Sequence, residues 1–304
     1  MTLLFGAISG NRAKLMLKGV VVKAYGGYYY VHGEGQDLEC TLRGKFKGRD
    51  QVLVGDQVLV EALAGGKGVV AGILPRRSVL PRPRIANVDL VAIVAAFREP
   101  EPVLNLVDRM LIQAEAAHLG ALIVLNKHDL VLDEPRPEWL EAYRAAGYRA
   151  VVTSTVTGEG VPELENILKD RVSVFAGPSG VGKSSLINLL VPGARLPTGD
   201  ISRKLRRGRH TTRHAELLRL QSGGLVADAP GFSSLALPEV PPEELASLFP
   251  EMRDLIGRCR FNSCLHYREP GCAVKSAVTE GKVADFRYRH YQGFLEEIIS
   301  RGRR

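Results

Sequence analysis

The sequence has few cysteines, a single tryptophan and no long apolar run. Four cysteines in 304 residues are too few for a scaffold built on disulfides. No apolar run is long enough to span a bilayer. The short apolar stretch at 3–8 has no basic flank before it and lacks the length and cleavage site of a signal peptide. We therefore expect a cytoplasmic protein with no membrane partner.

The chain is long enough for two or three domains, and its 45% apolar content is ordinary for a globular protein. It carries a formal net charge of +8. Such a charge favours a polyanionic partner such as a nucleic acid, although a basic surface without a partner would give the same count.

The most informative stretch, 177–184, lies between a predicted buried strand and a predicted helix. It fits the pattern G-x-x-x-x-G-K-S of a phosphate-binding loop, whose glycines let backbone N–H groups face the phosphates. Lys183 is expected to reach the β- and γ-phosphates, and the Ser184 hydroxyl to ligate Mg²⁺. A glycine-rich turn without a ligand is the alternative. The residues assigned to this loop are Gly177, Pro178, Ser179, Gly180, Val181, Gly182, Lys183, Ser184 and Ser185.

The stretch 88–168 alternates between strand and helix patterns, which predicts a parallel sheet flanked by helices. The expected strands cover 88–97, 121–125 and 149–153, and the expected helices cover 104–119, 138–146 and 162–168.

A second motif, N-K-x-D, follows the predicted strand at 121–125, where ligands bind in open α/β sheets. Asp129 can accept two hydrogen bonds from guanine, whereas adenine offers no such pair of donors. Asn126 would secure the loop, and Lys127 would lie along the purine. Ser154 stands in the position of the loop that closes over the base. The motif residues are Asn126, Lys127, His128 and Asp129.

N-K-x-D precedes the phosphate-binding loop, the reverse of the common GTPase order. A circular permutation allows this, because domain termini often lie close together. We therefore predict a circularly permuted P-loop α/β GTPase domain over 76–240, with an extended, proline- and arginine-rich linker at 75–84.

The basic stretch 193–214 is a candidate switch region. Thr211 or Thr212 would sense Mg²⁺ and the γ-phosphate, and the sequence leaves open which one. Farther on, D-x-x-G places Asp228 near Mg²⁺ and the Gly231 amide near the γ-phosphate. Phe232 occupies the place of a water-orienting glutamine, so unaided hydrolysis should be slow. His210 is a candidate catalytic residue or, alternatively, a structural or RNA-facing histidine.

Residues 1–75 read as short strands, which predicts a small closed barrel of the OB-fold type. The expected strands cover 18–24, 27–32, 38–42, 56–62 and 68–74. Tyrosines interleaved with cations at 23–32 are suited to contact nucleic acid, although core tyrosines would give the same pattern.

A cysteine cluster marks the C-terminal part, 241–304, which we predict to be a mainly helical zinc-binding domain. The four candidate ligands form C-x₄-C-x-H-x₅-C, and three thiolates with one imidazole make a closed, structural Zn²⁺ site. Buried free thiols are the alternative. A helix is expected over 283–300, and Cys40 reads as an ordinary strand residue. The candidate ligands are Cys259, Cys264, His266 and Cys272.

Taken together, these motifs resemble one family over nearly the whole chain. They are the OB-like start, N-K-x-D before G-P-S-G-V-G-K-S-S, G-R-H-T-T at 208–212, D-x-P-G-F and the Cys-Cys-His-Cys segment. It is the family of circularly permuted, small-subunit-dependent GTPases that act late in assembly of the small ribosomal subunit. The resemblance implies GTP hydrolysis with Mg²⁺, stimulated by the small subunit, with release coupled to hydrolysis. It also implies contacts to 16S rRNA and a part for His210 in hydrolysis.

We expect a monomer that binds GTP and GDP. Two other classes stay open: a P-loop kinase or ATPase, and a nucleic-acid-binding module that uses GTP only as a structural ligand.

Overall fold

The computed structural model describes residues 16–44, 52–81, 83–132, 134–198, 215–229 and 236–302. The chain divides into two compact units. Among the described residues, the first contains 16–87 and 215–218, and the second contains 88–198 and 219–302. The three-domain division with boundaries at 75 and 240 stays a prediction. Among the helices of these residues, none combines the length and apolar content needed to cross a membrane.

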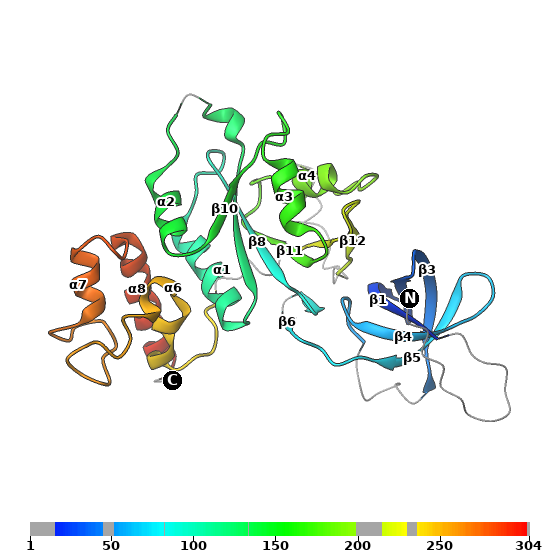
Figure 1. The fold of residues 1–304 in the computed structure, drawn as a ribbon, viewed down its shortest axis with the longest axis horizontal. Coiled ribbons are helices and arrows are strands. Elements are labelled where there is room, and N and C mark those ends of the chain that lie inside the picture. Colours follow the sequence, from blue (N-terminus) through cyan, green and yellow to red (C-terminus); the bar gives the residue numbers. More distant parts are fainter. Residues whose placement is uncertain are drawn as a thin grey trace. The chain divides into compact units, whose positions relative to one another are not determined.

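The first unit is a closed barrel of five strands in the order β1-β2-β3-β5-β4 (Figure 1). Valines from alternating strand positions fill its interior, and Cys40 is fully buried among them. Burial raises the pKa of the Cys40 thiol to about 11, so it stays protonated as an apolar core residue. The predicted OB-like barrel is confirmed. Its strands are β1 (Met16–Tyr25), β2 (Tyr28–Gly33), β3 (Gln36–Leu42), β4 (Gln57–Ala62) and β5 (Lys67–Ile73).

The stretch predicted as a linker folds against the barrel instead of standing free. It forms a small hairpin of β6 (Val79–Pro81) and β7 (Arg84–Ala86). The Arg76 guanidinium donates to both oxygens of the fully buried Asp56, at 2.6 and 2.8 Å. Proline and arginine content predicts an extended linker, but it cannot reveal a partner twenty residues earlier in the chain.

A second segment of the first unit comes from far along the sequence. Of the stretch 215–220, only β12 (Leu218–Arg219) joins the sheet of the second unit. Just before it, the Leu217 amide donates to the Val22 carbonyl at 2.8 Å, and Glu216 pairs with Lys23 at 3.1 Å. The residues before β12 therefore add to the barrel.

The second unit is built on a six-stranded sheet in the order β10-β9-β8-β11-β13-β12. The pairs from β10 to β13 are parallel, as the alternation of strand and helix predicts. All seven residues of β8 are buried, as expected for a central strand covered on both faces. The strands are β8 (Leu90–Ala96), β9 (Gly120–Asn126), β10 (Arg149–Val152), β11 (Val172–Ala176) and β13 (Leu225–Asp228).

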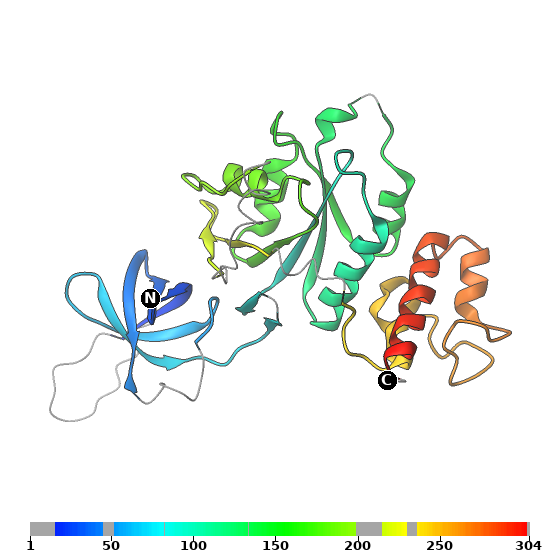
Figure 2. The ribbon, with the colours of Figure 1, turned by 180° about the vertical axis from the view of Figure 1, so that it is seen from behind.

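Helices cover both faces of this sheet (Figures 1 and 2). One face carries α1 (Leu104–Ala116) and α2 (Glu138–Ala145), and the other carries α3 (Val161–Leu168) and α4 (Lys183–Leu190). The strand that precedes the phosphate-binding loop, β11, lies between β8 and β13. The carboxyl ends of these parallel strands therefore meet at one edge, although the chain visits them in permuted order.

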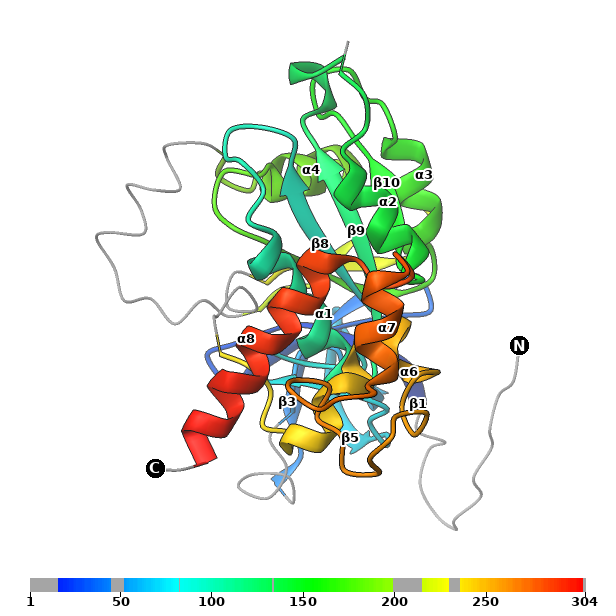
Figure 3. The same cartoon turned by 90° about the vertical axis from the view of Figure 1, so that its left-hand side faces the viewer.

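The C-terminal region is helical and packs on α1. Figure 3 shows α8 and α7 with α6 and α1. Phe249, Phe294 and Leu295 are buried in a core that also includes Ile112 of α1. The predicted terminal helix is confirmed as α8. The elements are η4 (Pro242–Leu248), α6 (Pro250–Arg253), α7 (Ala273–Thr279) and α8 (Asp285–Gly302).

Candidate active site and metal centre

The phosphate-binding motif forms the turn between β11 and α4. Gly177 has φ of 137°, and a Cβ placed on it would lie 2.2 Å from the Val94 carbonyl oxygen, so only glycine fits. Lys183, at the first turn of α4, is buried, and its ammonium donates to the carbonyls of Gly177 and Pro178 at 2.9 and 2.8 Å. The ammonium thus lies within the loop, where phosphate oxygens could take over its hydrogen bonds.

Asn126 joins the base-reading motif to the phosphate loop. Its fully buried amide donates to the Val181 carbonyl at 2.9 Å and accepts from the Thr153 hydroxyl at 3.0 Å. Gly182 lies against this amide, since a Cβ on it would come within 2.2 Å of Asn126 Nδ2. Three segments that are distant in sequence are therefore fixed to one another at a single side chain.

Asp129 faces the loop that follows β10. The Ser154 hydroxyl, fully buried, donates to Asp129 Oδ1 at 2.5 Å and accepts from the amides of Val156 and Thr157 at 3.2 and 3.1 Å. Because Ser154 is itself held by two amides, it fixes the orientation of the half-buried Asp129 carboxylate. This contact identifies a physical task for Ser154 that the sequence pattern leaves open.

The other two motif residues have contacts outside the conventional motifs. Lys127 has φ of 65°, and its ammonium donates to the carbonyl of Glu99 in the loop after β8. His128 Nδ1 lies 2.8 Å from Glu159 Oε2. Sequence reasoning identified neither partner, because a backbone carbonyl and a lone loop glutamate leave no pattern.

One oxygen donor suited to Mg²⁺ lies at the end of a strand, and another lies in the first turn of a helix. Asp228 ends β13 in register with Phe175, the penultimate residue of β11, and the Ala229 amide donates to the Phe175 carbonyl at 2.9 Å. Ser184 lies half-buried in the first turn of α4. Carboxylate and hydroxyl oxygens are the ligands that Mg²⁺ takes in such sites, so these residues fit the ion.

Four other predicted site residues fall outside the described residues, and their roles stay predictions. They are His210, Thr211, Thr212 and Gly231.

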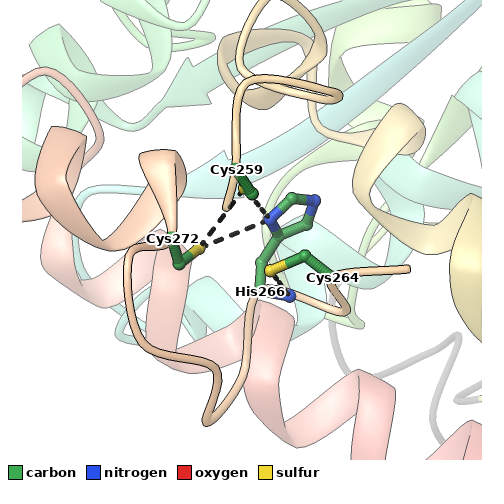
Figure 4. Close-up of side chains that lie close together, drawn as sticks. All are labelled: Cys259, Cys264, His266 and Cys272. Atoms are coloured by element: carbon green, nitrogen blue, oxygen red, sulfur yellow. Dashed lines mark hydrogen bonds between the residues drawn. The ribbon is translucent and has the colours of Figure 1, made fainter. Parts of the chain in front are cut away.

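The predicted metal ligands converge on one point (Figure 4). All four donor atoms lie within 4.8 Å of one another. Cys259 Sγ and Cys272 Sγ are 3.9 Å apart, and each lies 3.4 Å from His266 Nδ1. A tetrahedral zinc site requires about 3.8 Å between sulfurs and about 3.5 Å between sulfur and nitrogen. The cluster, completed by Cys264, is therefore compatible with zinc.

Backbone and aromatic groups hold this cluster in place. The Ala273 amide donates to Cys259 Sγ at 3.3 Å, and the Tyr288 hydroxyl donates to the His266 carbonyl at 2.9 Å. Burial raises the pKa of the Cys264 thiol to about 12 and lowers the pKa of His266. A metal ion that replaces the thiol protons would neutralise the buried thiolates and so remove the cost of burying their charge. This is the behaviour expected of metal ligands.

One arginine of the terminal helix lies in the core. The side chain of Arg287 is fully buried. It donates to Asp108 and Glu251, and a helical period of three and four places it on the same face as Tyr291 and Phe294. That period was the available signal.

Comparisons with known proteins agree with this geometry. The family model for RsgA GTPases matches residues 73–238, and that for the RsgA N-terminal domain matches residues 18–70. The small ribosomal subunit biogenesis GTPase RsgA of Moorella thermoacetica is 51% identical over 94% of this chain and 99% of its own length. The RsgA of Carboxydothermus hydrogenoformans is 47% identical over 93% of this chain and 98% of its own length.

Solved structures give the same answer. YjeQ from Thermotoga maritima superposes with a TM-score of 0.80 at 37% identity, covering 94% of this chain and 99% of that one. YloQ, described as a circularly permuted GTPase, superposes with a TM-score of 0.79 at 36% identity, covering 94% of this chain and 96% of that one. The match spans the N-terminal barrel, the permuted sheet and the C-terminal helical region of this chain. The chain belongs to the RsgA GTPase family.

Proposed function

We propose that this GTPase acts in the biogenesis of the small ribosomal subunit. It binds 16S rRNA, hydrolyses GTP faster on the subunit, and leaves the subunit after hydrolysis. The proposal is carried by relatives that bear this function in their names and align over 93–94% of the chain and 98–99% of their own length. The contacts that join Asn126, Ser154 and the phosphate loop support the choice of nucleotide independently, because they suit a guanine nucleotide.

At the nucleotide, each side chain has a distinct task. Asp129 accepts two hydrogen bonds from guanine, while Ser154 keeps its carboxylate oriented. Lys183 exchanges its carbonyl partners for phosphate oxygens and neutralises charge that develops on them. Asn126 keeps base and phosphate sites at a fixed separation, which places the γ-phosphate for attack by water.

Ser184 and Asp228 would hold Mg²⁺ beside the phosphates. When bound, the ion supplies positive charge to the β- and γ-phosphate oxygens. From the sequence, we assign sensing of the γ-phosphate to Gly231 and to Thr211 or Thr212, and assistance in hydrolysis to His210. Since Phe232 cannot orient water, turnover should be slow until the subunit completes the site.

Exposed aromatic residues support the assignment of RNA contacts. Tyr25 and Tyr28 are 63% and 47% exposed and pair across the turn that joins β1 to β2. In the segment between Cys259 and Cys264, Phe261 is 43% exposed, and the Arg260 guanidinium lies 5.6 Å from the centre of the Phe261 ring. Aromatic faces stack on unpaired bases, and cations beside them bind phosphates.

The four-ligand cluster would hold one Zn²⁺ with a structural task, because three thiolates and an imidazole supply all four ligands of a closed site. We further propose that the protein works as a cytoplasmic monomer.

The GTPase rate should be measured with and without purified small subunits, and with large subunits as the control. We expect stimulation by small subunits alone, and tighter subunit binding with a non-hydrolysable GTP analogue than with GDP. His210→Ala should keep binding but lose most of the stimulated turnover. An unchanged rate on small subunits would overturn the proposed function.

A further inference from the structure

We propose that His128, the variable position of the N-K-x-D motif, is a positioning residue for guanine recognition, and that Glu159 and Phe97 hold it in place. The inference rests on the proposed role of Asp129 in reading the base. None of the three side chains belongs to a conventional GTPase signature, and the sequence assigned only His128 to the site.

The first contact is a hydrogen bond between two loops. His128 Nδ1 lies 2.8 Å from Glu159 Oε2, and the imidazole is only 16% exposed. A carboxylate only accepts hydrogen bonds, so Nδ1 must carry the hydrogen in either charge state of the ring. The contact therefore fixes the tautomer as well as the ring orientation.

Glu159 and Ser154 belong to opposite ends of one turn. The Ser154 amide donates to the Glu159 carbonyl at 3.1 Å, and the Gly158 amide donates to the Ser154 carbonyl at 3.0 Å. Ser154 binds Asp129 while Glu159 binds the neighbouring His128. Two consecutive motif residues are thus tied to the two ends of a closed turn, which resists rotation of the motif better than one contact can.

Phe97 supports the imidazole. Its ring centre lies 5.1 Å from that of His128 at a tilt of 38°, and its amide donates to the Asn126 carbonyl at 3.0 Å. The ammonium of Lys127 reaches Glu99, two residues after Phe97. The loop after β8 thus contacts three consecutive residues of the motif, independently of the turn at 154–159.

The consequence for function is selectivity. Recognition by Asp129 requires both carboxylate oxygens to meet N1–H and the exocyclic amine of guanine. A small rotation of the motif loop would spoil this pair, while the phosphate contacts would remain. Loss of the Glu159 contact should therefore weaken the binding of guanine nucleotides more than that of inosine nucleotides, which lack the exocyclic amine.

The test compares GDP and inosine diphosphate affinities of the full chain by titration calorimetry. The variants are Glu159→Ala, the conservative Glu159→Gln, and Glu163→Ala as a control, whose side chain lies 57% exposed and 3.9 Å from Arg149. We expect Glu159→Ala to weaken GDP binding about three- to tenfold and to reduce the preference for GDP. Glu159→Gln, which still accepts a hydrogen bond from Nδ1, should restore most of the preference, and Glu163→Ala should match the wild type.

His128→Ala and its combination with Glu159→Ala complete a double-mutant cycle. Losses that do not add would support the direct contact. An unchanged preference in Glu159→Ala, or fully additive losses, would overturn the inference. A wild-type protein that binds both nucleotides equally would instead overturn the role of Asp129, so the two failures are distinguishable.

Discussion

The guanidinium of Arg287 lies 2.5 Å from Asp108, although 179 residues separate them in sequence. Glu251 accepts two further hydrogen bonds from the same guanidinium, and the ring of Phe249 packs 4.7 Å from its central carbon. Burial alone lowers the pKa of Arg287, but the two carboxylates more than offset this effect. One buried cation thus joins α8 and α6 to α1 of the sheet.

Asp108→Asn should lower the free energy of unfolding by about 3–5 kcal/mol, because a buried cation loses one of its charged partners. The single tryptophan, Trp139, reports on this region, since its ring lies 6.0 Å from that of Tyr143, over which Arg287 packs. Urea unfolding followed by its fluorescence is the measurement. Glu280→Gln, which breaks an exposed pair with Lys282, is the control and should cost less than about 0.5 kcal/mol. Equal, small changes in both variants would contradict a structural role for the pair.

Asp129→Asn should change the preferred base from guanine to xanthine. Asparagine offers an N–H donor where aspartate offers an acceptor, and xanthine carries a carbonyl where guanine carries an amine. Competition between GDP and xanthosine diphosphate on the variant is the measurement. Retention of the wild-type preference would refute the assignment of Asp129.

Gly182→Ala should weaken GTP and GDP binding together, by about ten- to a hundredfold, because the added Cβ collides with Asn126. Gly193→Ala is a matched control. Gly193 also has positive φ, at 79°, but has no heavy atom within 4 Å of the added Cβ. Gly193 lies beyond α4, outside the phosphate-binding loop, so it controls for the general cost of alanine at positive φ. If both variants bound nucleotide equally well, the contact between Asn126 and the phosphate loop would be dispensable.

Cys264→Ser should remove the metal, measured as zinc per chain in freshly purified protein. Cys40→Ser is the control, because Cys40 is buried in the barrel, and it should leave the zinc content unchanged.

Zinc affinity should also rise with pH. Burial raises the pKa of the Cys264 and Cys272 thiols, so at neutral pH these protons must leave when the metal binds. Lowering the pH therefore opposes binding, by about tenfold per pH unit for each proton released. Competition with a chromogenic chelator at two pH values measures this. An affinity independent of pH would mean that the thiolates are not the ligands.

The sequence supports a prediction wherever chemistry imposes a short local pattern. The phosphate loop, N-K-x-D and the cysteine cluster each require particular residue types at fixed spacing, and the apolar run at 90–96 matched a buried strand. Contacts between segments that only the tertiary fold brings together could not be predicted. Asp56 meets Arg76 and Glu159 meets His128 only because separate segments converge, and no local spacing encodes such meetings.

The start of the terminal helix illustrates a second limit. Charge counting treats every arginine as surface, so Arg287 and Arg289 look alike in composition. They differ by helical phase: Arg287 faces the core with Tyr291, whereas Arg289 is 73% exposed. The helical periodicity of the apolar residues distinguishes the buried arginine from the exposed one, whereas a count of charges does not.

The strand order has a consequence for synthesis. When translation has produced β10, strands β8, β9 and β10 can already pair, but the partner for the other edge of β8 has not been made. That edge belongs to a strand whose seven residues are all apolar, and Val172, which begins the missing strand, lies 83 residues beyond Asp89. At about 5–20 residues per second, the edge stays open for roughly 4–17 seconds. Permutation thus leaves the most apolar strand of the sheet as an unpaired edge during growth, the condition under which strands pair with other chains.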